Sequence, residues 1–113
     1  MLRKQMNIIE PKNIEVISLH PYEYVHYLDD MGRNFLSLHQ EVGFGSYSEN
    51  IILTDAESQK LNKDKLKFIR QLISTFNLKT KTFEFHNNER HISNFNHWAC
   101  VKVALDKWHG RIG

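Results

Sequence analysis

Apolar residues recur at three- and four-residue steps in the stretch LNKDKLKFIRQLISTF, which covers residues 61–76. This spacing predicts an α-helix with one apolar side, because such residues share a face at 3.6 residues per turn. The predicted buried stripe consists of Leu66, Ile69, Leu72, Ile73 and Phe76. The opposite side is mostly cationic, so one face of this helix requires a core and the other faces water or a negative partner.

Helix boundaries are marked by capping signals. Thr54 followed by Glu57 matches a capping box, so the helix begins there or restarts at Asn62. A second helix is predicted from Asn96 to His109 and ends at Gly110. Its expected buried stripe is Trp98, Val101, Leu105 and Trp108.

Runs rich in β-branched and aromatic residues predict strands. They cover Ile14–Leu19, Tyr22–Leu28, Asn34–His39, Ile51–Leu53 and Lys79–His86. A Gly-containing turn at residues 29–32 joins the second and third runs into a hairpin. The Gly- and Ser-rich residues 42–50 form either a loop or an irregular edge strand.

A group of strands followed by helices favours the α+β class. We expect an antiparallel sheet of four or five strands with two helices packed on one face, and one core that unites both helices with Phe83 and Phe85. At 113 residues the chain corresponds to a single domain, residues 1–113, in which residues 1–12 are a candidate disordered leader.

Composition and the absence of targeting signals indicate the cellular compartment of the protein. Hydrophobic residues make up 41% and charged residues 25% of the chain, which is typical of globular proteins. A membrane span needs about 20 apolar residues in a row, and a secretory signal needs an apolar segment behind its basic residues; the sequence has neither. With a single cysteine, Cys100, there is no internal disulfide. We therefore expect a cytoplasmic protein.

The net charge of +2 hides an asymmetry, because acidic side chains outnumber basic ones in residues 1–54 and the reverse holds in residues 55–113. Such asymmetry indicates a charged partner. One candidate site is a basic helix face that would follow a phosphate backbone. It consists of Lys60, Lys63, Lys67 and Arg70. Nucleic-acid binding is therefore one alternative function.

Histidine is abundant, with 7 in the chain, and it is a common metal ligand and general base. The weak metal candidates are His86, His91 and His97, which lie in or next to the polar stretch 85–97. None of them has a known ligand spacing, so we assign no metal, no cofactor and no catalytic residue. A metal-dependent hydrolase built on this stretch is a second alternative.

Tyrosines gather in the acidic half of the chain, around the predicted hairpin. Tyrosine beside acidic residues suits binding to a basic protein surface. The expected partner-binding residues are Tyr22, Tyr24, Tyr27, Asp29 and Asp30. The favoured function is a non-enzymatic protein-interaction module, in its most concrete form a small inhibitor or immunity-type protein that blocks a toxin or nuclease.

Overall fold

The computed structural model describes residues 8–42, 45–80, 91–92 and 94–112. Its four strands are β1 (Ile14–His20), β2 (Tyr24–Asp29), β3 (Asn34–Val42) and β4 (Gly45–Ile52). Its helices are α1 (Asp55–Lys63), α2 (Lys65–Thr80), the 3₁₀-helix η2 (Phe95–His97) and α3 (Ala99–Ile112). The α+β class and the antiparallel sheet are confirmed.

The four strands form one sheet in the order β1-β2-β3-β4, and every neighbouring pair is antiparallel. In β2 and β3 successive side chains enter opposite faces of the sheet. Tyr27 pairs with Phe35 on one face, and His26 pairs with Leu36 on the other. Residues 45–50, which the sequence left as a loop or an irregular strand, are part of β4.

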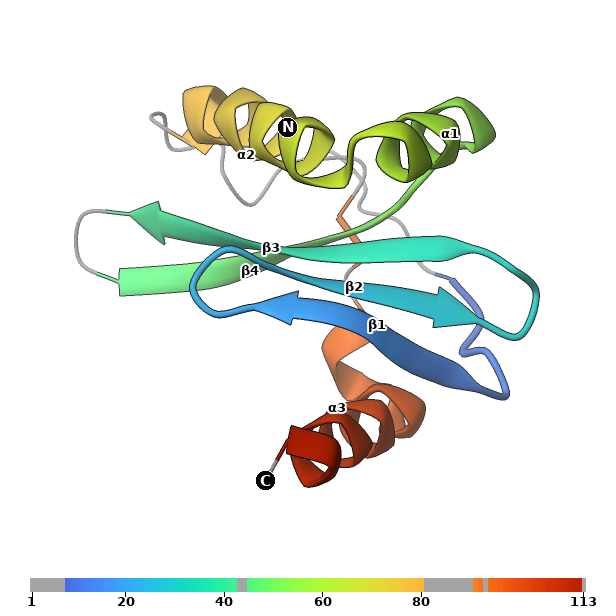
Figure 1. Cartoon of the computed structure of the whole chain (residues 1–113). Helices are drawn as coiled ribbons and strands as arrows, with labels where there is room; N and C mark the ends of the chain where they lie inside the picture. The colour runs from blue at the N-terminus through green and yellow to red at the C-terminus, as the bar shows by residue number, and fades with distance from the viewer. Residues whose placement is uncertain (1–7, 43–44, 81–90, 93, 113) are drawn as a thin grey trace.

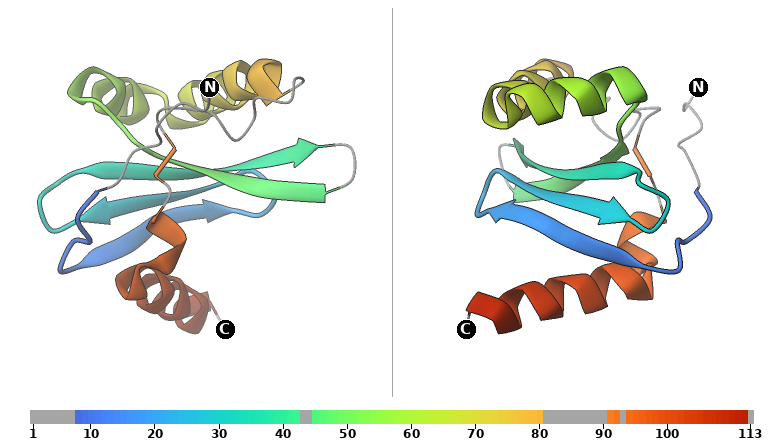
Figure 2. Two further views of the ribbon diagram at one scale, coloured as in Figure 1. Left: turned by 180° about the vertical axis from the view of Figure 1, so that it is seen from behind. Right: turned by 45° about the vertical axis from the view of Figure 1, so that its right-hand side comes forward.

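Helices cover both faces of this sheet. In Figure 1 α1 and α2 lie above it and α3 lies below it, and the views in Figure 2 agree. The two helices expected on one face lie on opposite faces of the sheet. The physical reason is that β3 carries large apolar side chains of both parities, Phe35 and then Leu36, so each face needs its own cover.

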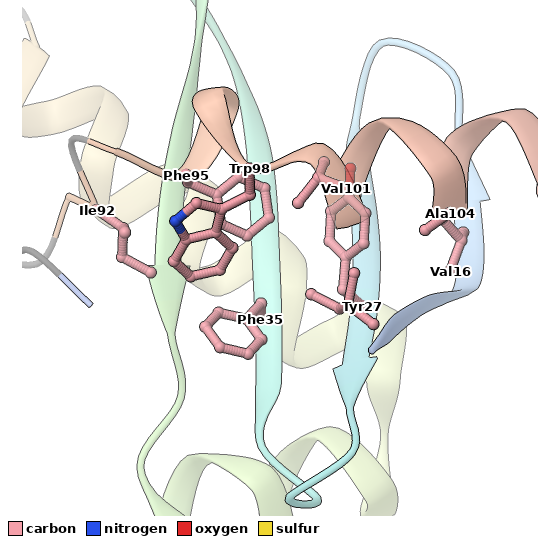
Figure 3. Packing of buried hydrophobic residues seen from close by; sticks show 9 residues of the cluster. Val16, Tyr27, Phe35, Ile92, Phe95, Trp98, Val101 and Ala104 are labelled. Atoms are coloured by element: carbon pink, nitrogen blue, oxygen red, sulfur yellow. The ribbon is translucent and has the colours of Figure 1, made fainter. Parts of the chain in front are cut away.

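The core on the α3 side is mostly aromatic. Tyr27, Phe35, Phe95 and Trp98 meet there with ring centroids 5.1–6.0 Å apart, largely in edge-on and tilted arrangements. Figure 3 shows these rings beside Val101 of α3. The predicted stripe of the last helix is thus partly confirmed, because Trp98 and Val101 are buried on this side.

The second core lies between the sheet and α1–α2. It contains Tyr24, Leu36, Leu38, Ile51, Leu53, Leu61, Phe68 and Ile69. The predicted stripe of the helix is corrected here, since Leu66 is 40% exposed and Phe68 takes its place in the core. The predicted single helix is two helices, because the chain leaves helical geometry at Asp64 and starts again at Lys65. The capping box at Thr54 and Glu57 is present.

The boundaries differ from the predictions at both ends of the chain. Lys79 and Thr80, expected to begin a strand, end α2, and the rest of that run, with Phe83 and Phe85, lies outside the described residues. The last helix continues through Gly110 to Ile112. In the candidate leader, Ile8 exchanges two hydrogen bonds with the Asn94 side chain and Pro11 is buried, so this part packs against the fold.

Candidate functional site

The turn between β1 and β2 holds the most exposed tyrosine that the structure describes, Tyr22, at 85% exposure. The N–H of Glu23 donates to the carbonyl of His20 at 3.0 Å, which closes a four-residue turn. Pro21 occupies its second position, and Tyr22 follows at φ +63°. A type II turn places a residue of positive φ at this third position, where glycine or asparagine is usual.

The backbone of Tyr22 therefore has a conformation that is unfavourable for a residue with a side chain. Left-handed geometry costs a side-chain-bearing residue about 1–2 kcal/mol. Within the described part of the chain, Tyr22 is the one non-glycine residue with positive φ. Its ring meets His39 edge-on, with centroids 6.0 Å apart, and otherwise faces solvent. Because the ring is largely exposed, its packing offsets little of this strain energy. Strained residues of this kind often occur at functional sites.

Charged groups surround the turn. The Glu23 carboxylate lies 3.8 Å from His20 Nδ1 and 3.9 Å from Arg70 Nε. The ammonium of Lys65, on α2, lies 5.9 Å from the centre of the Tyr24 ring of β2. The Arg70 guanidinium thus offsets the negative charge of Glu23 beside Tyr22.

The other two tyrosines of the predicted partner surface are buried, which corrects the sequence-based site. Tyr24 points into the core beneath α1–α2, and Tyr27 points into the core above α3. Burial raises the pKa of the Tyr27 hydroxyl well above its ordinary value. Helices on one face alone would leave the other face of the sheet exposed, and α3 covers that face.

The two aspartates at the β2–β3 turn have different environments. Asp29 is buried: its Oδ1 accepts the N–H groups of Met31 and Arg33, and its Oδ2 accepts from Arg33 Nε at 2.7 Å. Asp30 is exposed. A buried aspartate neutralised by an arginine contributes little to the negative potential outside the protein. The turn therefore attracts a basic partner less strongly than predicted. It also lies at the opposite end of β2 from Tyr22.

The four basic candidates are all exposed on the outer side of α1–α2: Lys60, Lys63, Lys67 and Arg70. The two lysines of α1 precede Asp64, and the other two cations follow it. Arg70 approaches the turn that carries Tyr22, with its Nε 3.9 Å from the Glu23 carboxylate. The structure therefore places Arg70 beside Glu23, the residue that follows Tyr22 in the turn.

The weak metal candidates do not form a ligand set in the described residues. His91 Nδ1 lies 3.4 Å from the Oε1 of Glu49, which is 1% exposed, and 3.3 Å from the backbone nitrogen of Asn50. His97 is exposed, and His86 lies outside the described residues. A search of the described part of the chain finds no group of three metal-binding side chains.

Two buried polar networks were missed by the sequence analysis. One fastens Ile92 and Asn96 to the sheet: Ile92 N–H donates to the Asn50 carbonyl, and the Asn50 side chain contacts Ser37 and Asn96. The weak signal for it was Glu49-Asn50, two polar residues in succession before apolar strand residues. Such a pair puts a polar group on each face of a strand, where a partner must be found.

The second network links the sheet to α1. Asn34 Nδ2 donates to Ser58 Oγ at 3.1 Å, so its Oδ1 is left to accept from His26 Nε2 at 2.8 Å. In this arrangement the neutral His26 imidazole carries its proton on Nε2. Its Nδ1 is buried and has no hydrogen-bond partner among the described residues. Burial lowers the pKa of His26, the nearby Lys65 lowers it further, and the bond to Asn34 opposes them.

This lowered pKa predicts that acid destabilises the fold. The unfolded chain binds a proton at His26 near pH 6.5 and the folded chain only at lower pH, so stability falls as the pH drops below about 6.5. One such proton contributes at most about 1.4 kcal/mol per pH unit.

Urea unfolding of wild type and His26→Gln across this pH range measures how the free energy of unfolding depends on pH. The variant should lose part of the slope, whereas His109→Gln, at an exposed site, should retain it. Equal slopes in all three proteins would refute the assignment.

Comparison with known proteins identifies no relative: the chain matches no family model, no curated protein and no solved structure. No helix in the described residues is long and apolar enough to cross a membrane. We therefore infer the function from the geometry of this chain.

Proposed function

We propose that the protein is a non-enzymatic protein-interaction module that binds its partner through the turn carrying Tyr22. The observation that supports this proposal is that Tyr22 combines 85% exposure with a φ of +63°. A tyrosine is a favoured anchor at protein interfaces, because it buries a large rigid ring and its hydroxyl still forms a hydrogen bond. Glycine would fit the turn with less strain, so the ring is the feature that the fold does not need.

The most specific form of the proposal is a small inhibitor or immunity-type protein in the cytoplasm, which blocks a toxin or nuclease. A small single domain with a rigid exposed anchor suits this task, since a preorganised turn loses little entropy on binding. The lone cysteine is consistent with a reducing compartment. The expected basic partner of the sequence analysis receives less support, because Asp29 is buried and paired with Arg33.

Site-specific crosslinking tests the proposal. Tyr22 is replaced by the photoreactive residue p-benzoylphenylalanine in cells that naturally make the protein, and the adducts are identified by mass spectrometry. The matched control carries the same residue at Val103, which is 51% exposed on α3. We expect one dominant protein adduct at Tyr22 that is absent at Val103. Identical adducts at both positions, or none at Tyr22, would contradict the proposal.

The inhibitory form has its own test. Co-expression with the crosslinked protein should suppress the toxicity or nuclease activity of that protein. Unchanged activity in the complex would leave a binding module without an inhibitory role.

Nucleic-acid binding is the second candidate, favoured by the exposure of Lys60, Lys63, Lys67 and Arg70 on one side of the molecule. It requires an affinity that falls steeply with salt, because each phosphate contact releases counterions. Titration of duplex DNA and of RNA at several salt concentrations distinguishes the two functions. Weak binding at physiological salt is expected if the module binds protein.

A further inference from the structure

Helix α1 covers the sheet with little apolar contact. Of its 9 residues, Leu61 is the one that is buried, whereas α2 contributes both Phe68 and Ile69 to the second core. A helix of this length is not stable alone in water, so α1 depends on its contacts with the rest of the fold. Within the layer formed by α1 and α2, it is therefore the part that opens most readily.

A chain of side-chain hydrogen bonds fastens α1 to the sheet. Asn34 donates to Ser58 of α1 and accepts from His26 of β2. Ser58 and Leu61 are three residues apart, so they lie on the same side of the helix. His26 pairs with Leu36, which belongs to the core beneath α1 and α2. His26 is therefore a titratable group at the contact between α1 and the sheet.

The surroundings of His26 offer no negative charge on the sheet. The side chains that neighbour it on the strands, or that belong to its hydrogen-bond chain, are uncharged: Ser18, Leu36, Asn34 and Ser58. Farther along the same strands, the Tyr24 ring stacks on that of His20 with centroids 5.9 Å apart. Neither of these rings supplies a negative counter-charge in acid.

The charged groups of the helical layer do not stabilise a cation at His26. Burial lowers the pKa of His26, and the positive charge of Lys65, the first residue of α2, lowers it further. Asp55 and Asp64 are exposed, and Glu57 takes part in the capping box. A proton added at Nδ1 therefore creates a buried cation whose new N–H has no acceptor among the described residues.

We propose that protonation of His26 releases α1 from the sheet, so that this helix is an acid-opened cover of the second core. Opening hydrates the imidazolium and exposes one buried side chain of the helix, Leu61. The aromatic core on the α3 side is made of other residues and stays packed. Release of α1 therefore precedes global unfolding, and it is independent of the proposed binding at Tyr22.

Hydrogen exchange of the full chain, followed by mass spectrometry between about pH 7.5 and pH 5, tests this inference. Exchange rates are corrected for the intrinsic effect of pH on amide exchange. Amides around Val101 and Ala104, which are buried in α3, give the reference rate for global unfolding. We expect α1 amides to exchange faster than this reference. Their exchange should accelerate below about pH 6.5 by up to about tenfold per pH unit, the limit for one proton.

Two variants identify the titrating group. His26→Gln retains a donor for Asn34 but takes up no proton, so the exchange of α1 should become independent of pH. Asn34→Asp keeps the shape of the side chain and adds a negative charge beside the imidazole, so it should abolish or reverse the acceleration in acid. His109→Gln, at an exposed site on α3, is the matched control and should behave like wild type.

The inference is overturned if α1 amides exchange no faster than the α3 reference, or if their faster exchange does not depend on pH. Acceleration that persists in His26→Gln or in Asn34→Asp would also overturn it. Circular dichroism at neutral pH establishes that each variant is folded, and Asn34→Asp decides the question if His26→Gln does not fold.

Discussion

Replacing Asp29 by alanine is expected to lower the free energy of unfolding by about 3 kcal/mol. The carboxylate accepts two backbone N–H groups and the Arg33 guanidinium, and it is fully buried. Its removal leaves those donors without their acceptor and a half-buried cation without its counter-charge. Urea denaturation at neutral pH measures the loss.

Asp30→Ala is the matched control for this experiment. Asp30 is the next residue and is exposed, so its removal should change stability by no more than about 0.5 kcal/mol. Equal losses in the two variants would contradict the buried position of Asp29. They would restore the acidic turn as a candidate partner surface.

Phe35→Ala should cost about 3–5 kcal/mol, because it leaves a cavity in a core that cannot fully collapse. Phe35 is buried, and its ring lies 5.9 Å from that of Trp98 and 6.0 Å from that of Phe95. Met31→Ala, at a largely exposed position in the preceding turn, should cost little. Thermal unfolding followed by circular dichroism compares the two. A small loss at Phe35 would mean that α3 does not pack on this face.

The elements of the fold could be predicted from local patterns where one physical signal dominates. Strand alternation placed β2 and β3, and the reciprocal bonds of Thr54 and Glu57 marked the start of α1. Helix periodicity failed at Leu66 because Leu66 and Phe68 lie on different sides of the helix, and each fits a stripe with Ile69. Which stripe is buried depends on how α2 restarts after Asp64, a tertiary effect.

The number of helical layers could not be deduced from the order of elements. A sheet covered on one face and a sheet covered on both faces can have the same order of strands and helices. They differ in whether the side chains that point to both faces of the strands are apolar. Phe35-Leu36 carried that information, since neighbouring strand residues face opposite sides. The second layer buries Tyr24 and Tyr27 on opposite faces, and that burial changed the candidate site.

Tyr22 could be selected from the sequence as a partner-binding residue, but its geometry could not. Pro21 before it is compatible with several turns, and whether the next residue has positive φ depends on the strands that the turn joins. The contact between Glu23 and Arg70 was also hidden, because the two residues are distant in sequence. Long-range contacts of this kind require the fold.

The most direct test of the central claim, that Tyr22 is kept for binding at the expense of stability, is the Tyr22→Gly variant. Glycine adopts positive φ without strain, so the free energy of unfolding should rise by about 1 kcal/mol. Binding to the protein captured at Tyr22 should weaken at least about tenfold, as measured by calorimetry. A variant that is less stable than wild type, or that binds the partner equally well, would contradict the account.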